Sequence, residues 1–233
     1  PETININGID RPARNSEGKL IHPTEEGIRN FYEWFSESVV TDTDGRPRVV
    51  YHGTRDDFNV FDKSQSNTGD IAGWFSSDKS RANVFAGKES GNVIPVYLAI
   101  KNTLDLLQAT DRYTLETWVD IFDEVGINNI ELDSALYENG EYYFWDLFPH
   151  RGQDLNEDSN LLEKIKDAGY DGIIYNSEHQ GRIDEERNYV AFNPNQIKSA
   201  IGNTGAFSSE NDDIRFSKAE LIPETINING IDR

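Results

Sequence analysis

The chain has 233 residues, enough for one large domain or two small ones with a sizeable buried core. Its formal net charge is −20, from 42 acidic against 22 basic residues, which argues against a surface for duplex nucleic acid, because phosphate neutralisation needs clustered Lys and Arg. The acidity favours simple solubility, with an acidic face for a basic partner as the alternative. The absence of cysteine excludes disulfides, thiolate chemistry and Cys-ligated zinc.

The same eleven residues, PETININGIDR, occur at 1–11 and again at 223–233. An identity of this length is not due to chance, and it indicates a repeat period, a reused linker or an artefact. We assign it no catalytic role. The expected organisation is a linker or repeat segment over 1–22, one domain over 23–207, and a tail over 208–233 that contains the second copy.

An amphipathic helix is predicted to begin at Thr24, which is a suitable N-cap. Its apolar residues recur at helical spacing and are Ile28, Phe31, Trp34 and Phe35. A turn is predicted over 42–45 and a strand over 48–51 that leads into His52.

The centre of the chain alternates short apolar runs with helical patterns. In chain order we expect a strand over 73–78, a helix through 79–87 capped by Ser77 or Asp78, a buried strand over 92–100, a loop over 102–107 and a helix over 112–125 that stops at Gly126. Residues 127–157 have no clear pattern.

The last third is predicted to hold a helix that begins at Ser159 or Asn160 and ends at Gly169, strands over 170–175 and 188–193, a charged loop between them, and a further strand before the tail. Strands outnumber helices and do not alternate regularly with them. The fold class is therefore α+β. The longest apolar runs are too short to span a membrane and no signal-peptide pattern opens the chain, so we expect a soluble domain.

Common catalytic motifs are missing from the sequence, including the Walker loop, G-x-G-x-x-G, H-E-x-x-H, the calcium loop and G-x-S-x-G. The histidines do not sit at metal-ligand spacing from one another, and they are His22, His52, His150 and His179. We therefore expect no metal.

Three strings on separate predicted strands do form a pattern: YHGT at 51–54, GWFSSDKSRANVF at 73–85 and NYVAFNPNQIKSA at 188–200. Their order and spacing resemble the ADP-ribosyltransferases whose signature is His, Tyr and Glu on three strands. The chain looks most like the copies embedded in polyvalent proteins of phages and prophages, over residues 20–217. The resemblance implies a split β-sandwich of two packed antiparallel sheets with flanking helices, and NAD in the cleft between them.

The resemblance implies that residues of the first string, which lie at the end of its strand, contact the ligand. His52 would hydrogen-bond the nicotinamide-side ribose, and Gly53 would let its backbone approach the carboxamide, where a side chain would interfere. Thr54 is similar to a hydroxyl that contacts the adenosine side of the ligand. The alternative is that His52 only ends a strand.

The second string is similar to the part of the family that supplies aromatic rings around the nicotinamide. By resemblance these rings are Phe75 and Phe85, with core packing as the alternative and with Trp74 able to exchange roles with Phe75. Ser80 lies near the serine that holds the carboxamide in the family.

The third string departs from the family, because Asn188 occupies the position of the catalytic glutamate. A glutamate would fix the ribose hydroxyls and stabilise the oxocarbenium ion as nicotinamide leaves. Strand alternation puts Glu186 on the same face as Asn188 and Glu185 on the opposite face, so Glu186 is the candidate replacement. Arg55 and Arg81 are candidates for the diphosphate, with solvated surface positions as the alternative.

These resemblances imply a mono-ADP-ribosyltransferase that takes ADP-ribose from NAD to a macromolecular target, expected to be a host protein, with His52, Glu186 and Asn188 as catalytic residues. Poly-ADP-ribosylation is not expected. The resemblance also implies a phage or prophage effector, or toxin, delivered to the bacterial cytoplasm. Two alternatives remain at this point: hydrolysis of NAD, and a catalytically degenerate domain that serves as a binding or structural repeat.

Overall fold

The structure is a computed structural model, which describes residues 2–66, 68, 70–87, 91–109, 112–131, 140–149, 159–176 and 186–215. Among these residues, no helix is long and apolar enough to cross a membrane. His150, His179, Glu185 and the second copy of the repeat lie outside the described residues.

The described elements follow one another as β1 (Thr3–Ile6), β2 (Ile9–Pro12), α1 (Glu25–Phe35), β3 (Val50–Thr54), η1 (Lys63–Gln65), β4 (Gly73–Ser76), α2 (Lys79–Phe85), β5 (Asn92–Leu98), β6 (Thr103–Leu106), β7 (Arg112–Thr114), α3 (Leu115–Glu124), β8 (Glu141–Tyr143), η2 (Phe144–Leu147), α4 (Leu161–Asp167), β9 (Gly172–Tyr175), β10 (Asn188–Ala191), η3 (Pro194–Gln196) and β11 (Ile197–Ser199). The elements labelled η are short 3₁₀ helices.

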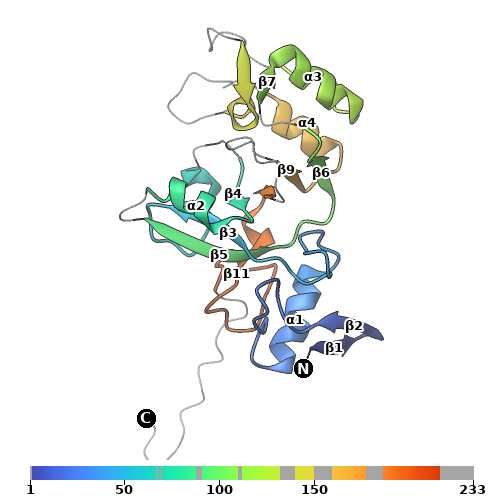
Figure 1. The fold of residues 1–233 in the computed structure, drawn as a ribbon, viewed down its shortest axis with the longest axis vertical. Coiled ribbons are helices and arrows are strands. Elements are labelled where there is room, and N and C mark those ends of the chain that lie inside the picture. Colours follow the sequence, from blue (N-terminus) through green and yellow to red (C-terminus); the bar gives the residue numbers. More distant parts are fainter. Residues whose placement is uncertain are drawn as a thin grey trace, which may run out of the picture.

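A seven-stranded sheet forms the centre of the molecule, in the order β11-β5-β3-β4-β10-β9-β6 (Figure 1). Within the described residues β3 joins β4 through the single pair Tyr51↔Ser76, whereas it pairs with β5 along its whole length. The sheet therefore consists of two halves that separate beside β3. This arrangement confirms the expected α+β class, although the two halves are hydrogen-bonded into one sheet rather than being fully separate.

One pair of strands, β6 and β9, is parallel, which differs from the expected antiparallel pairing. Residues 102–107 were expected to form a loop, but residues 103–106 within them form an edge strand. Asp171 explains why β6 lies parallel to β9. Its carboxylate accepts hydrogen bonds from the backbone N–H groups of Lys101 and Asn102. This contact fixes the starts of β6 and β9 beside each other.

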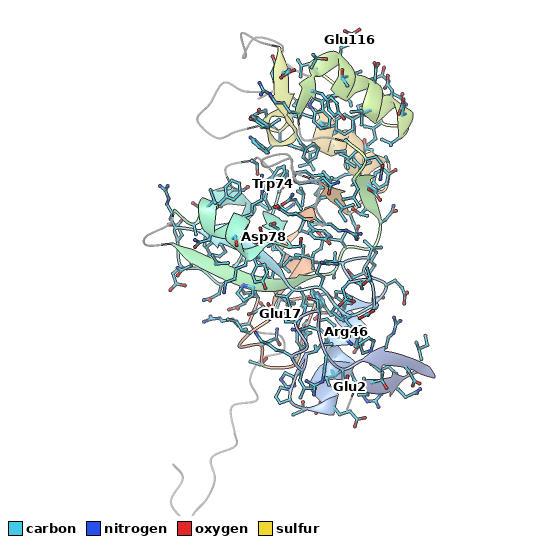
Figure 2. The ribbon with its side chains drawn as sticks, viewed as in Figure 1. Glu2, Glu17, Arg46, Trp74, Asp78 and Glu116 are labelled. Atoms are coloured by element: carbon cyan, nitrogen blue, oxygen red, sulfur yellow. The ribbon has the colours of Figure 1, made fainter. Side chains whose placement is uncertain are left out.

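Figure 1 shows α3 and α4 at one end of the sheet, α1 with the β1–β2 hairpin at the other, and α2 over β3 and β4. A core cluster at the α3 and α4 end includes Trp118, Phe122 and Phe144. Figure 2 shows Trp74 and Asp78 between Glu116 at that end and Glu2 near the hairpin. Helices therefore cover both ends of the sheet. Strands β3 and β4 separate in the middle of the molecule.

The N-cap predictions are confirmed at α1 and α2. Thr24 Oγ1 accepts a hydrogen bond of 3.1 Å from the Gly27 N–H, and Asp78 Oδ1 accepts one of 2.7 Å from the Ser80 N–H. The helix expected over 112–125 begins later, at Leu115, because Arg112–Thr114 pair with β8 as strand β7.

Phe31 lies at the centre of the core cluster under α1. Its ring is completely buried and contacts five other rings, which are those of Tyr32, Trp34, Phe35, Tyr97 and Phe207. The last two come from distant parts of the chain, so this ring ties α1 to β5 and to the segment after β11.

We expect Phe31→Ala to destabilise the fold by about 3–5 kcal/mol, because it removes a buried ring and leaves a cavity. A denaturant titration measures the loss. Val84→Ala on α2, where the side chain is 57% exposed, is the control and should change stability by less than about 0.5 kcal/mol. Equal effects of the two substitutions would contradict the packing described for α1.

Candidate active site

Proline at position 95 fixes which backbone groups of β3 face the split. Tyr51 lies opposite Pro95, which has no N–H, so this pair cannot exchange two hydrogen bonds. Instead, the Pro95 carbonyl accepts from the Ala200 N–H on the other side of β5. Tyr51 and, two residues on, Gly53 therefore turn their N–H and C=O groups toward β4. At Gly53 the described part of β4 no longer pairs with β3.

His52 takes the β4 carbonyl that would continue the ladder. If the register of Tyr51↔Ser76 continued, Gly53 would pair with Trp74. In the structure the Trp74 carbonyl instead accepts a hydrogen bond of 2.9 Å from His52 Nδ1. Because a carbonyl can only accept, Nδ1 carries the proton, and in the neutral ring Nε2 keeps a free lone pair.

The His52 ring lies among three phenylalanine rings. The ring centroids of Phe61, Phe75 and Phe58 are 5.0, 5.6 and 6.0 Å from that of His52. Burial in this surrounding lowers the pKa of His52 below its ordinary value of 6.5, although the bond to the Trp74 carbonyl acts in the opposite direction. The site therefore holds a neutral imidazole near pH 7.

Gly53 lies directly against the backbone of α2. A Cβ atom at this position would be 1.8 Å from the Ala82 carbonyl oxygen. The glycine is thus required for the close approach of α2 to β3, in addition to any approach of a ligand. Its neighbours are less involved: the Thr54 hydroxyl accepts from the Asp56 N–H, and Arg55 is exposed.

The two predicted aromatic residues lie in different surroundings. Phe75 is 3% exposed and packs against Phe61 at 5.5 Å, whereas Phe85 is 62% exposed at the end of α2. Gly53 and Tyr51 share the face that α2 covers, and alternation along β4 directs Ser76 to this face and Phe75 to the other. Among the described residues no ring contact joins Phe75 and Phe85. Their role around nicotinamide stays a prediction.

Glu186 is held at the split by two partners. Ser76 Oγ donates a hydrogen bond of 3.2 Å to Glu186 Oε1, and Arg81 Nε lies 3.4 Å from the same oxygen. The Arg81 and Glu186 side chains are 13% and 21% exposed, so the ion pair is largely shielded from water. Arg81 also lies over the Phe85 ring, with its Cζ 5.7 Å from the centroid.

Asn188 is 3% exposed and lies opposite Ser76 in the β4–β10 register. Opposite residues of an antiparallel pair share a face, so Asn188 and Ser76 are on the same side as Gly53. The structure therefore gathers Gly53, Ser76 and Asn188 with the Arg81–Glu186 pair at the α2 side of the split. The His52 imidazole occupies the split itself through the bond to the Trp74 carbonyl.

Sequence reasoning missed Ser76, Phe58, Phe61 and the Trp74 carbonyl. The position of Ser76 next to Phe75 on a buried strand was the available signal for Ser76, since a buried polar side chain needs a hydrogen-bond partner. The apolar residues after YHGT, in FNVF at 58–61, were the available signal for Phe58 and Phe61. The role of the Trp74 carbonyl depends on backbone register, which no side-chain pattern specifies.

A family model described as "ADP-Ribosyltransferase in polyvalent proteins" matches residues 42–207, more than half of the chain. The chain belongs to this family, which confirms the resemblance carried by the three strings. No curated protein and no solved structure matched the chain significantly.

The described residues contain no group of three or more His, Cys, Asp or Glu side chains that could hold a metal ion. The family uses NAD as its substrate.

We expect the free energy of unfolding to fall as the pH decreases from about 7 to 5.5, in part because of His52. The pKa of His52 is lowered in the folded state, so below pH 6.5 the unfolded chain binds more protons and is favoured. Urea titrations across this range measure the slope, which for one group is at most about 1.4 kcal/mol per pH unit. His52→Gln should have a smaller slope, and an unchanged slope would contradict the buried neutral imidazole.

Gly53→Ala is expected to destabilise the fold by about 1–3 kcal/mol, since the new methyl group forces α2 away from β3. Thermal unfolding measures the change. Asn83→Ala, at an exposed position of the same helix, is the matched control with little expected effect. A Gly53→Ala protein as stable as the control would show that α2 is not packed on β3 as described.

Proposed function

We propose that the chain is an NAD-dependent mono-ADP-ribosyltransferase that transfers ADP-ribose to a host protein. Membership of the family supports ADP-ribosyltransferase activity in general. One observation carries the finer proposal: the backbone edge of Gly53 faces the split beside a fixed carboxylate, Glu186, on the α2 side. An amide ligand and a developing positive charge would each find a matching group there.

The backbone of Gly53 is complementary to a carboxamide. Its N–H can donate to the carboxamide oxygen and its C=O can accept from the carboxamide nitrogen. His52 would assist from the same strand: Nδ1–H is committed to the Trp74 carbonyl, so Nε2 would accept from a ribose hydroxyl. The bond to Trp74 fixes the tautomer and the orientation of the ring, which lowers the entropic cost of binding.

The chemical step breaks the bond between the nicotinamide nitrogen and ribose C1′. The electron pair leaves with nicotinamide, the ribose becomes an oxocarbenium ion, and an acceptor nucleophile then bonds to C1′ and loses its proton. A carboxylate placed beforehand near C1′ stabilises this cation. Glu186 is the candidate, with the Asn188 amide hydrogen-bonding a ribose hydroxyl.

Arg81 neutralises Glu186 in the structure, which weakens its effect on a cation. The diphosphate of NAD is an alternative partner for a guanidinium at this position. If Arg81 moved to the diphosphate, with Arg55 as a second contact, the Glu186 carboxylate would be released toward the ribose. Binding of NAD would then itself free the Glu186 carboxylate from its ion pair with Arg81.

The neutral Asn188 at the family's glutamate position supports transfer of a single ADP-ribose, as the resemblance implies. The same residue, together with the Arg81–Glu186 ion pair, favours a second candidate function: an NAD-binding domain without catalysis. The two differ in one measurable product, since only the transferase releases nicotinamide.

Incubation with labelled NAD and a bacterial lysate tests the proposal. We expect label on protein, together with release of nicotinamide, and loss of both in His52→Ala. Glu186→Gln should lower the rate of nicotinamide release by roughly 10²–10³, because it removes the charge and keeps the shape. The control is Glu163→Gln, at an exposed position of α4, with an unchanged rate.

Calorimetry with NAD separates the two candidates. Binding heat without nicotinamide release would leave the non-catalytic binding domain, and neither binding nor release would contradict both. Label on protein without free ADP-ribose would distinguish transfer from hydrolysis of NAD.

A further inference from the structure

The first copy of the repeated segment is part of the folded domain. Residues 3–12 form the β1–β2 hairpin, with Asn7 and Gly8 at positive φ in its turn. Ile4 is the buried residue of the hairpin, at 8% exposure, and belongs to the core cluster under α1. The Asn5 carbonyl accepts a hydrogen bond of 3.0 Å from Arg29 Nη1 on α1.

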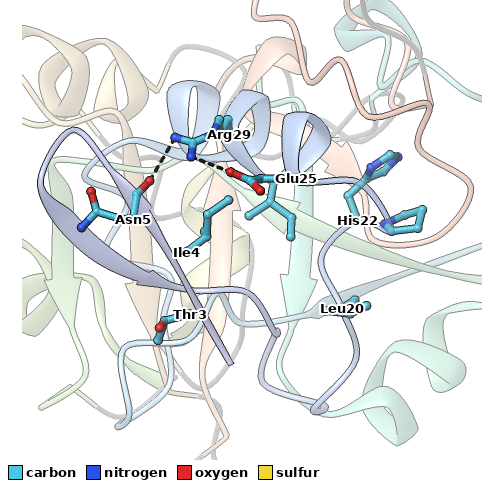
Figure 3. Close-up of a pocket in the computed structure, with 9 residues that line it drawn as sticks. Thr3, Ile4, Asn5, Leu20, His22, Glu25 and Arg29 are labelled. Carbon is cyan, nitrogen blue, oxygen red and sulfur yellow. Dashed lines mark hydrogen bonds and ion pairs between the residues drawn. The ribbon is translucent and has the colours of Figure 1, made fainter. Parts of the chain in front are cut away.

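The hairpin leaves part of α1 uncovered, although the Tyr32 hydroxyl donates to the Pro12 carbonyl and Arg11 lies over the Tyr32 ring. A cavity of about 460 Å³ remains between β1, the segment 20–23 and the start of α1 (Figure 3). Figure 3 shows Arg29 reaching from α1 to Asn5 and to Glu25 along the cavity wall. A two-stranded hairpin is marginally stable by itself. With one buried side chain and a cavity beneath it, its local opening should need much less free energy than global unfolding.

Residues 223–233 repeat residues 1–11 letter for letter, which is the whole hairpin except Pro12. Ile226 corresponds to Ile4 and Asn227 to Asn5, so the second copy carries the same apolar side chain and the same backbone acceptor for Arg29. The second copy can therefore make the contacts with α1 that residues 4 and 5 make. The hydrogen bond from the Tyr32 hydroxyl of α1 to the Pro12 carbonyl lies outside the repeat and is not reproduced.

The described chain ends near this site. The Arg215 carbonyl accepts from the Thr204 N–H at 3.1 Å, and the next residue, Gly205, accepts a hydrogen bond from Asn30 of α1 through its carbonyl. A Cβ at Gly205 would lie 2.6 Å from the ring of His22, which lines the cavity. Residues 216–222 span up to about 25 Å when extended, which suffices to bring the second copy to α1.

We propose that the α1 surface under the hairpin is a docking site for the segment PETININGIDR, and that residues 223–233 occupy it within the same chain whenever residues 1–11 detach. The first copy is the usual occupant, because it continues directly into the folded chain, where the Ala13 N–H donates to the Glu2 carbonyl. The second copy is a replacement held at high effective concentration by a short connection. A second molecule at micromolar concentration competes poorly with it.

A double-mutant cycle on the full chain tests the proposal, with Ile4→Asp, Ile226→Asp and both together. Aspartate cannot occupy the apolar position of Ile4 without a large desolvation cost. We expect each single variant to melt within about 1 °C of the wild type, because one intact copy remains, and the double variant to melt roughly 4 °C or more lower. A double variant that melts like Ile4→Asp alone would overturn the proposal, whether both are destabilised or neither is.

Cross-linking locates the second copy directly. The chain has no cysteine, so two introduced cysteines are its only thiols. In the Ile4→Asp background, Arg29→Cys with Asn227→Cys should join within one molecule when treated with a short bifunctional thiol reagent. Arg29→Cys with Asn5→Cys, in an otherwise unchanged chain, is the positive control. A linked dimer, or no link where the control links, would overturn docking within the chain.

Discussion

The hydrogen bond from His52 Nδ1 to the Trp74 carbonyl is the contact on which the central part of the structure depends. The bond goes to the acceptor that Gly53 would use if the ladder continued, at the point where β3 and β4 separate after one pair. An ordinary continuation would close the sheet and leave no backbone edge for a ligand. The same bond holds the imidazole in one tautomer, and burial among phenylalanine rings keeps it neutral.

The contacts around the split follow from this separation. Gly53 must lack a side chain so that α2 can cover its face, and α2 in turn delivers Arg81 to Glu186. Ser76, the β4 residue of the single pair, holds the same carboxylate. The family membership and this arrangement are consistent with each other, since the resemblance implies two sheet halves that separate, and β3 and β4 pair through one residue pair only.

Much of the fold could be predicted from the sequence, because caps and apolar spacing are local signals. Thr24 and Asp78 begin their helices as expected, and the third string does form a strand. Strand β6 was missed, since its pairing depends on Asp171, which is distant in sequence. Motif order pointed to His52 and strand alternation to Glu186, and both lie at the split, where their roles stay predictions. Ser76 was not proposed, because strand register is a property of the folded sheet.

Hydrogen exchange at the Gly53 amide tests whether the split binds the substrate, since this N–H is expected to meet the carboxamide of NAD. Saturating NAD should slow exchange of the Gly53 amide by roughly tenfold or more. The Ser199 amide, which donates to the Ile214 carbonyl away from the split, should be unaffected. Binding of NAD that leaves the Gly53 amide unprotected would contradict the assignment of the split as the substrate site.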